Sequence, residues 1–122
     1  MTKIVFYKFG DSFWGFEEQG HAGLDVEGED ILCASLSAIT MFVVNAIEVV
    51  YASDVKYEVD EDAACIRVST CSTLPEFEAD EKKRYAISGL FTAHYNQLKL
   101  LLEEFPDLLK VDVVEKKYEH NN

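Results

Sequence analysis

The stretch KIVFYKFGDSFWGFEE, residues 3–18, opens the chain with two segments that favour extended backbone. Residues 3–9 and 12–18 are rich in Val, Ile, Phe, Tyr and Trp, the side chains most enriched in strands. Gly10-Asp11 between them is a strong signal for the tight turn of a hairpin. We therefore expect an N-terminal β-hairpin, against which the following elements can pack.

A long apolar helix is expected after this hairpin. Residues 20–28 contain three glycines and no periodic pattern, which predicts a mobile loop. Beyond the loop the chain is apolar at nearly every position down to residue 52, and Asp30 is a good N-cap for a helix that begins near Glu29 or Asp30. Because this helix is apolar almost all round, we expect it to be central and covered on several sides.

The rest of the chain predicts a second hairpin, a second helix and a last strand. Residues 55–60 and 64–69 read as two strands around an acidic turn at 60–62. Pro75 is expected to open an amphipathic helix and Pro106 to stop it, with apolar positions at Ala86, Leu90, Ala93, Leu98, Leu101 and Phe105. Residues 111–114 make a short strand, and the polar tail at 115–122 is expected to fray.

The order ββαββαβ predicts an α/β (α+β) fold, a mixed β-sheet with two packed helices, in a single domain over residues 1–122. With 48 % hydrophobic and 12 % aromatic residues, the chain can bury enough surface to fold and is not a disordered acidic tail. Its 23 acidic and 11 basic residues give a formal charge of -12, which repels phosphate backbones and excludes nucleic acid as a partner. Basic partners are favoured instead.

The cysteines and the chain start indicate a cytoplasmic protein. Three cysteines at uneven spacing argue against a disulfide framework and predict free thiols in a reducing compartment. The first residues lead straight into a short alternating run rather than into a signal peptide. The apolar segment 31–52 has acidic flanks, so we expect no membrane span; its polar interruptions are Ser35, Ser37, Thr40, Asn45 and Glu48.

A histidine and a cysteine stand where a helix is expected to begin. Gly20-His21-Ala22 lies in the glycine-rich loop, and Cys33 follows His21 by twelve residues. If Asp30 caps the helix, Cys33 is its third residue, where unpaired backbone N–H groups favour a thiolate and can hold an oxyanion. A protonated His21 nearby would lower the cysteine pKa further, and the pair would act as nucleophile and general base in acyl transfer. The spacing alone also allows a plainer interpretation, in which Cys33 is a small, apolar first-turn residue.

The string Gly-His-Ala, the twelve-residue step to cysteine and the sequence DILCASLS, residues 30–37, resemble the signature of the ribosomal-processing cysteine protease family. This resemblance implies an endopeptidase that removes an N-terminal extension from a large-subunit ribosomal protein. It implies a dyad of His21 as general base and Cys33 as nucleophile, with no cofactor. The chain departs from the family pattern where that pattern favours Val, Ala and an aromatic residue, namely at Leu32, Ser35 and Leu24.

The resemblance also assigns the residues around the dyad and a partner. Gly20 and Ala22 match the motif beside His21, and Asp30 is expected to cap or orient the helix. Ser37 is expected to line the site one turn after Cys33. Members of the family are similar in being homodimers, and a partner could cover part of the apolar helix.

The residues argue against one alternative to a protease, a zinc site, and leave another open. A zinc site lacks ligand spacing, because His94 reads as a packed helix residue, while Cys65 and Cys71 lie on a strand and in a loop. The main rival is a non-catalytic acidic dimer, an assembly factor that holds a basic ribosomal-protein tail. Charge favours both functions, whereas a reactive Cys33 thiolate is expected only of a protease.

Overall fold

Strands and helices follow one another in the predicted order ββαββαβ in the computed structural model of the chain, which describes residues 1–20 and 29–119. One short π-helical turn, η1, directly extends the first helix. The elements are β1 (Thr2–Phe9), β2 (Ser12–Gln19), α1 (Glu29–Asn45), η1 (Ala46–Val50), β3 (Lys56–Asp60), β4 (Cys65–Ser69), α2 (Glu81–Glu104) and β5 (Leu109–Glu115).

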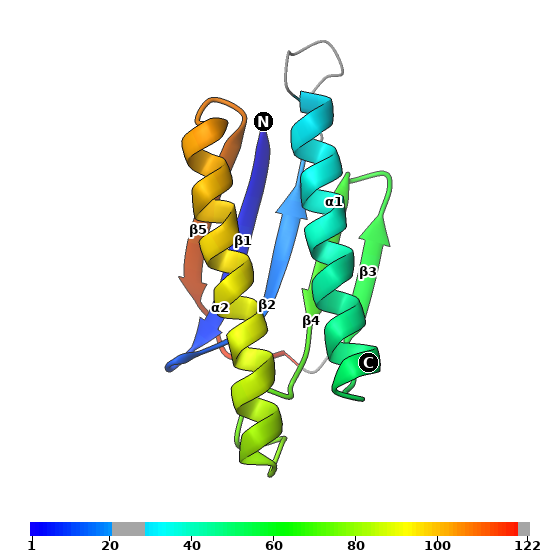
Figure 1. Ribbon diagram of the computed structural model, residues 1–122, viewed down its shortest axis with the longest axis vertical. Coiled ribbons are helices and arrows are strands. Elements are labelled where there is room, and N and C mark those ends of the chain that lie inside the picture. Colours follow the sequence, from blue (N-terminus) through cyan, green and yellow to red (C-terminus); the bar gives the residue numbers. More distant parts are fainter. Residues whose placement is uncertain (21–28, 120–122) are drawn as a thin grey trace.

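The strands form one mixed sheet in the order β3-β4-β2-β1-β5. β1 and β5 are parallel, whereas β1–β2, β2–β4 and β3–β4 are antiparallel. Both helices lie on the same face of the sheet, with α2 beside β1 and β5 and α1 toward β3 and β4 (Figure 1). The structure therefore confirms the expected fold class, a mixed sheet with two packed helices.

The core fills the space between this sheet face and the two helices. Alternation along β1 turns Ile4 and Phe6 inward, and Phe16 of β2 joins them. His94 of α2 is buried with its ring 4.5 Å from that of Phe16 and 5.2 Å from that of Phe6. Burial lowers the pKa of His94 to about 4, so the imidazole is a neutral core group, in line with the packed histidine expected from the sequence.

One side of α1 faces solvent, which corrects the expectation of a helix covered on several sides. Leu32, Leu36 and Val43 seat the helix on the sheet. The large apolar side chains exposed on α1 and η1 are Ile31, Met41, Phe42, Val49 and Val50. The reason is geometric, because the two helices lie side by side on one face of the sheet, and no described element covers the side of α1 that points away from the sheet (Figure 1).

By length and composition alone, the helical segment Asp30–Val50 is long and apolar enough to cross a membrane. Of the 18-residue stretch of this segment that meets the hydropathy test, only 28 % is buried inside the protein. The same segment packs its buried residues on the sheet, so one side of it belongs to the core, and the other side exposes large apolar side chains.

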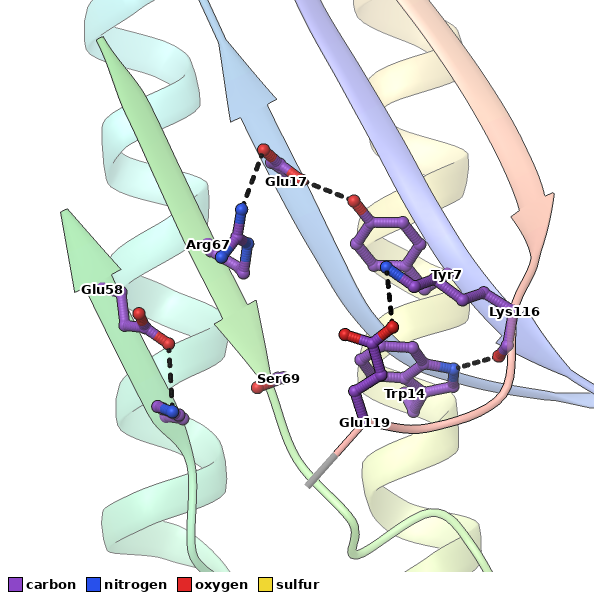
Figure 2. A pocket seen from close by; sticks show the side chains of 9 residues that line it. Tyr7, Trp14, Glu17, Glu58, Arg67, Ser69, Lys116 and Glu119 are labelled. Carbon is purple, nitrogen blue, oxygen red and sulfur yellow. Dashed lines mark hydrogen bonds and ion pairs between the residues drawn. The ribbon is translucent and has the colours of Figure 1, made fainter. Parts of the chain in front are cut away.

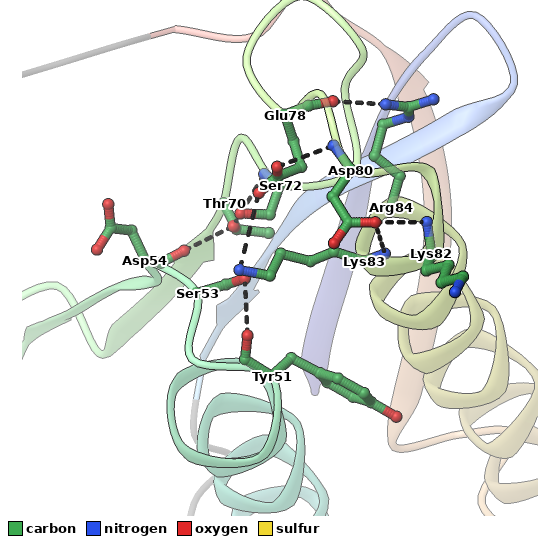
Figure 3. Close-up of polar contacts among 10 residues, drawn as sticks. All are labelled: Tyr51, Ser53, Asp54, Thr70, Ser72, Glu78, Asp80, Lys82, Lys83 and Arg84. Carbon is green, nitrogen blue, oxygen red and sulfur yellow. Dashed lines mark hydrogen bonds and ion pairs between the residues drawn. The ribbon is translucent and has the colours of Figure 1, made fainter.

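The second helix begins later than the sequence predicts. Pro75 lies in a series of turns, and α2 starts at Glu81 after Asp80, whose carboxylate accepts from the backbone N–H groups of Lys82 and Lys83 (Figure 3). A side-chain cap that satisfies unpaired N–H groups therefore sets the start, rather than the proline. Its buried residues are Ile87, Phe91, His94, Leu98 and Leu101, a stripe shifted from the one expected. The helix ends at Glu104, and Pro106 follows as predicted.

The tail packs on the sheet as far as Glu119, which corrects the expected fraying. The backbone N–H of Lys116 donates to the Lys8 carbonyl at 2.8 Å, and the Trp14 indole donates to the Lys116 carbonyl at 2.8 Å. The ring of Tyr118 meets Trp14 edge-on at 5.1 Å. Trp14 thus anchors the tail to the face of the sheet opposite the helices; residues 120–122 lie outside the described residues.

Candidate functional site

The helix that carries Cys33 begins at Glu29, one residue earlier than a helix capped by Asp30. Asp30 is therefore a residue of the first turn and not the N-cap, which corrects that assignment. Cys33 is consequently the fifth helical residue rather than the third.

Cys33 lies at the border between core and solvent. Its side chain is half-buried, next to Leu32, which is fully buried, and Ile31, which is 66 % exposed. Helical side chains lean toward the N-terminus, so the thiol lies back over the first turn, where backbone N–H groups lack intrahelical partners. A thiolate and a developing oxyanion are both favoured near the unpaired N–H groups of a helix end.

Three of the predicted site residues share one side of α1. Asp30, Cys33 and Ser37 follow at steps of three and four residues, which places them next to one another along the helix surface. Asp30 and Ser37 are exposed and Cys33 is half-buried. The helix therefore presents a carboxylate, a thiol and a hydroxyl at one accessible edge.

Gly20 directly follows β2, in a position that only glycine fits. Its φ is +80°, and an added Cβ would lie 2.8 Å from the Met1 carbonyl oxygen. Its N–H donates to the Ala64 carbonyl at 3.0 Å, which ties it to the β3–β4 turn. The end of β2 and the start of α1 lie at the same end of the molecule (Figure 1). His21, Ala22 and the loop expected up to residue 28 lie outside the described residues.

We expect Gly20→Ala to destabilise the protein by about 1–3 kcal/mol, because it adds both a strained φ and a backbone clash. Gly89, exposed in the middle of α2 with no atom within 4 Å of a built Cβ, provides the matched control. Gly89→Ala should stabilise the protein by about 0.5–1 kcal/mol, since alanine favours a helix interior. Urea unfolding measures both, and equal effects of the two variants would contradict the role given to Gly20.

A polar network on the opposite face of the sheet was not predicted from the sequence. Glu17 accepts from Tyr7, Gln19, Cys65 and Arg67, with 2.9 Å to Gln19, 3.0 Å to the Cys65 thiol and 3.3 Å to Arg67 (Figure 2). Burial raises the pKa of Glu17, but these four hydrogen bonds outweigh it and hold the pKa at about 2. The strand period of two could have placed these residues on one face.

This network distinguishes Cys65 from Cys33. Burial, followed by the hydrogen bond to ionised Glu17, raises the pKa of Cys65 to about 11. Burial also raises the pKa of Cys71. Both are half-buried free thiols, and a thiol with a raised pKa is a poor nucleophile at neutral pH. Neither Cys65 nor Cys71 is therefore expected to act as a nucleophile.

Hollows of about 300 and 400 Å³ adjoin the network. Their cationic side chains lie beside carboxylates, as in the pairs Lys56–Glu58 and Lys116–Glu119 (Figure 2). Within residues 1–20 and 29–119, no three His, Cys, Asp or Glu side chains lie together as a metal site would require.

A second acid, Glu18, was not predicted from the sequence either. It points to the helix side of the sheet, in phase with Phe16, and is buried against α1. Because strand side chains alternate, Glu18 faces the same side of the sheet as Phe16. A carboxylate at such a core-facing position was the signal that could have identified Glu18.

Comparison with known proteins gives the family of the chain. The family model described as "Cysteine protease Prp" matches residues 1–119. A curated relative, the "Ribosomal processing cysteine protease Prp" of Bacillus subtilis (strain 168), is 27 % identical over 96 residues, covering 79 % of this chain and 81 % of that protein.

Solved structures share the fold. The crystal structure of SMU.848 from Streptococcus mutans has a TM-score of 0.77 and 27 % identity, covering 95 % of this chain and 96 % of that one. The essential ribosomal processing protease Prp from S. aureus, solved in complex with a substrate peptide, has a TM-score of 0.70 and 17 % identity, covering 95 % and 100 %. The family match over nearly the whole chain, together with these folds, shows that the chain belongs to the cysteine protease Prp family, whose members hydrolyse peptide bonds.

Proposed function

We propose that this protease removes the N-terminal extension of a large-subunit ribosomal protein, with Cys33 as nucleophile and His21 as general base. The observation that carries the proposal is the half-buried Cys33 at the N-terminal end of α1, beside solvent. The family match adds the reaction class, and the name of the B. subtilis relative adds ribosomal processing.

In the proposed reaction the Cys33 thiolate attacks the scissile carbonyl carbon, and the carbonyl electrons move to the oxygen. Backbone N–H groups in the first turn of α1 stabilise that oxyanion. Collapse breaks the C–N bond, and protonated His21 gives its proton to the leaving amine. Water, deprotonated by His21, then attacks the thioester, which releases the new carboxylate and restores the thiolate.

The charge of the chain supports a basic substrate. We propose that the enzyme meets this substrate in the cytoplasm. A formal charge of -12 attracts cationic ribosomal proteins before any bond is broken. The rival proposal, a non-catalytic factor that only holds such a tail, has the same charge preference. Incubating the protein with the extended ribosomal protein from the same organism, and mapping product termini by mass spectrometry, separates the two. A single new N-terminus supports the protease, and an intact substrate contradicts it.

We further propose that the enzyme is a homodimer joined through the exposed side of α1 and η1. Phe42, Val49 and Val50 are 68–70 % exposed there. The helical segment Asp30–Val50 has 21 residues. A helix of that length spans about 30 Å, enough for an interface of about 800 Å² per partner. Burying these side chains in a second copy removes apolar surface from water.

Phe42→Glu should convert the dimer to a monomer, because it places a charge in the proposed apolar interface. Val114→Glu provides the matched control, since Val114 is 42 % exposed on β5. Light scattering after size exclusion measures the mass of each variant. A wild-type mass of one chain, or a Phe42→Glu mass equal to that of the wild type, would contradict the proposed dimer.

A further inference from the structure

A buried carboxylate joins the sheet to the helix that carries Cys33. Glu18 of β2 is 7 % exposed and Thr40 of α1 is 2 % exposed. The Thr40 hydroxyl donates to Glu18 Oε2 at 2.9 Å. The contact is thus a side-chain hydrogen bond, made out of water, between β2 and α1.

The groups that face Glu18 in the described residues carry no charge. Its sheet neighbours are Ile4 of β1 and Ile66 of β4, and Thr40 faces it from α1. Glu17 and Gln19 alternate to the other face of the sheet. On α2 the buried His94 is neutral above its pKa of about 4. Glu18 therefore has a hydrogen-bond donor but no cation beside it.

Such a carboxylate is costly when ionised. Burial raises the pKa of Glu18 to about 6, and the Thr40 hydrogen bond only partly opposes this shift. A folded-state pKa above the unfolded value means that the native protein binds the proton more tightly. The contribution of Glu18 to stability is therefore most favourable below about pH 4.5 and is lost as the pH rises through 6.

In sequence, Glu18 and Thr40 flank the two residues of the proposed dyad. Glu18 is three residues before His21, at the end of the strand from which that residue follows. Thr40 is seven residues after Cys33, which is about two helical turns along the same side of α1. The relative position of β2 and α1 therefore fixes the two points of the chain that residues 21–28 connect.

We propose that Glu18 and Thr40 are positioning residues, in which the ionised Glu18 carboxylate accepts from Thr40 and fixes the end of β2 against the helix that carries Cys33. The proposal rests on the proposed protease function and explains why a costly acid occupies a core position. Catalysis is sensitive to placement, because a shift of about 1 Å between reacting groups can lower a rate about 100-fold.

The first test is Thr40→Val, which keeps the shape and removes the hydroxyl. We expect kcat, measured on a peptide spanning the extension junction, to fall about tenfold, with KM within about twofold. The acid limb of kcat should move to higher pH, because the lost hydrogen bond favoured the ionised carboxylate. Thr40→Ser, which keeps the donor, should restore most of kcat and the original limb.

The second test is Glu18→Met, an unbranched apolar replacement of similar size. It should raise the urea midpoint at pH 8, with a smaller gain at pH 5, where wild-type Glu18 is largely protonated. It should also lower kcat about tenfold at pH 8. A purely structural residue would not give a more stable enzyme with a lower kcat. Glutamine does not ionise, so Glu18→Gln should lack the part of the fall in kcat at low pH that comes from protonation of Glu18.

Matched controls come from α2. Thr92 is exposed and donates to the Ser88 carbonyl at 3.0 Å within its own helix, so Thr92→Val removes a hydroxyl without touching β2. Glu104→Gln removes an exposed carboxylate. Both control variants should keep the wild-type kcat and pH profile.

Two results would overturn the proposal: a folded Thr40→Val variant with the wild-type kcat and pH profile, or a Glu18→Met variant with full kcat. If Thr40→Val does not fold, the Glu18→Met and Glu18→Gln variants decide.

Iodoacetamide alkylation of Cys33, with Cys65 and Cys71 replaced by Ser, separates this proposal from the proposed function. The alkylation rate reports the reactivity of the Cys33 thiol and requires no substrate. If the wild type does not cleave the peptide but Thr40→Val and Glu18→Met still change the Cys33 alkylation rate, the substrate assignment fails and the positioning stands. If the wild type cleaves and these variants cleave equally fast, the positioning alone fails.

Discussion

Cys33→Ala is expected to abolish cleavage of the extended ribosomal protein while the fold remains intact. The change removes one sulfur atom from a half-buried helical position, and alanine is the best helix former. Loss of the nucleophile from a catalytic unit costs on the order of 10⁴–10⁶ in kcat. Timed digests analysed by mass spectrometry measure the loss, and circular dichroism verifies the fold.

The other two cysteines provide the controls for this loss. Cys65→Ser keeps a donor to Glu17, and Cys71→Ser changes a loop residue, so both should cleave as the wild type does. The non-catalytic rival predicts that Cys33→Ala binds the tail as well as the wild type and that neither cleaves it. Full cleavage by Cys33→Ala would end the assignment of Cys33 as nucleophile.

His21→Ala is expected to lose a comparable factor in kcat, because the thiolate and the imidazole would act as one unit in the proposed dyad. Residues that act together are strongly non-additive, so the double variant His21→Ala with Cys33→Ala should be no slower than either single variant. A double variant slower by the product of the two losses would show that the residues act independently.

Alkylation against pH tests the resting state of the same pair. If the proposed ion pair forms, a protonated His21 acts on the thiol at contact range, as the helix end does, whereas charges beyond a Debye length of about 8–10 Å are screened. Asp30 is the described acid nearest in sequence, and it does not cap the helix, so its charge opposes the thiolate. We expect the Cys33 pKa to lie below the free-thiol value of about 8.5 and to rise in His21→Ala. An unchanged value at or above 8.5 would show that no ion pair exists before substrate binds.

The local patterns of the sequence were enough for the elements and their order. The two apolar runs around Gly10-Asp11 predicted the first hairpin, now β1 and β2. The alternation at 55–60 and 64–69 predicted β3 and β4. The signature around Cys33 was enough to predict the protease family, which the family match confirms. These signals are readable because turn residues and side-chain period act between neighbours along the chain.

Contacts between distant segments decided the rest. Asp80, not Pro75, begins α2, because its carboxylate satisfies two backbone N–H groups. The outer side of α1 is exposed because both helices share one face of the sheet, and the tail is ordered because Trp14, about a hundred residues earlier, binds it. Glu18 is a core residue only because Thr40 of α1 packs over it. Local periodicity determines which element forms, whereas the partner that covers each face is set by packing between residues far apart in sequence.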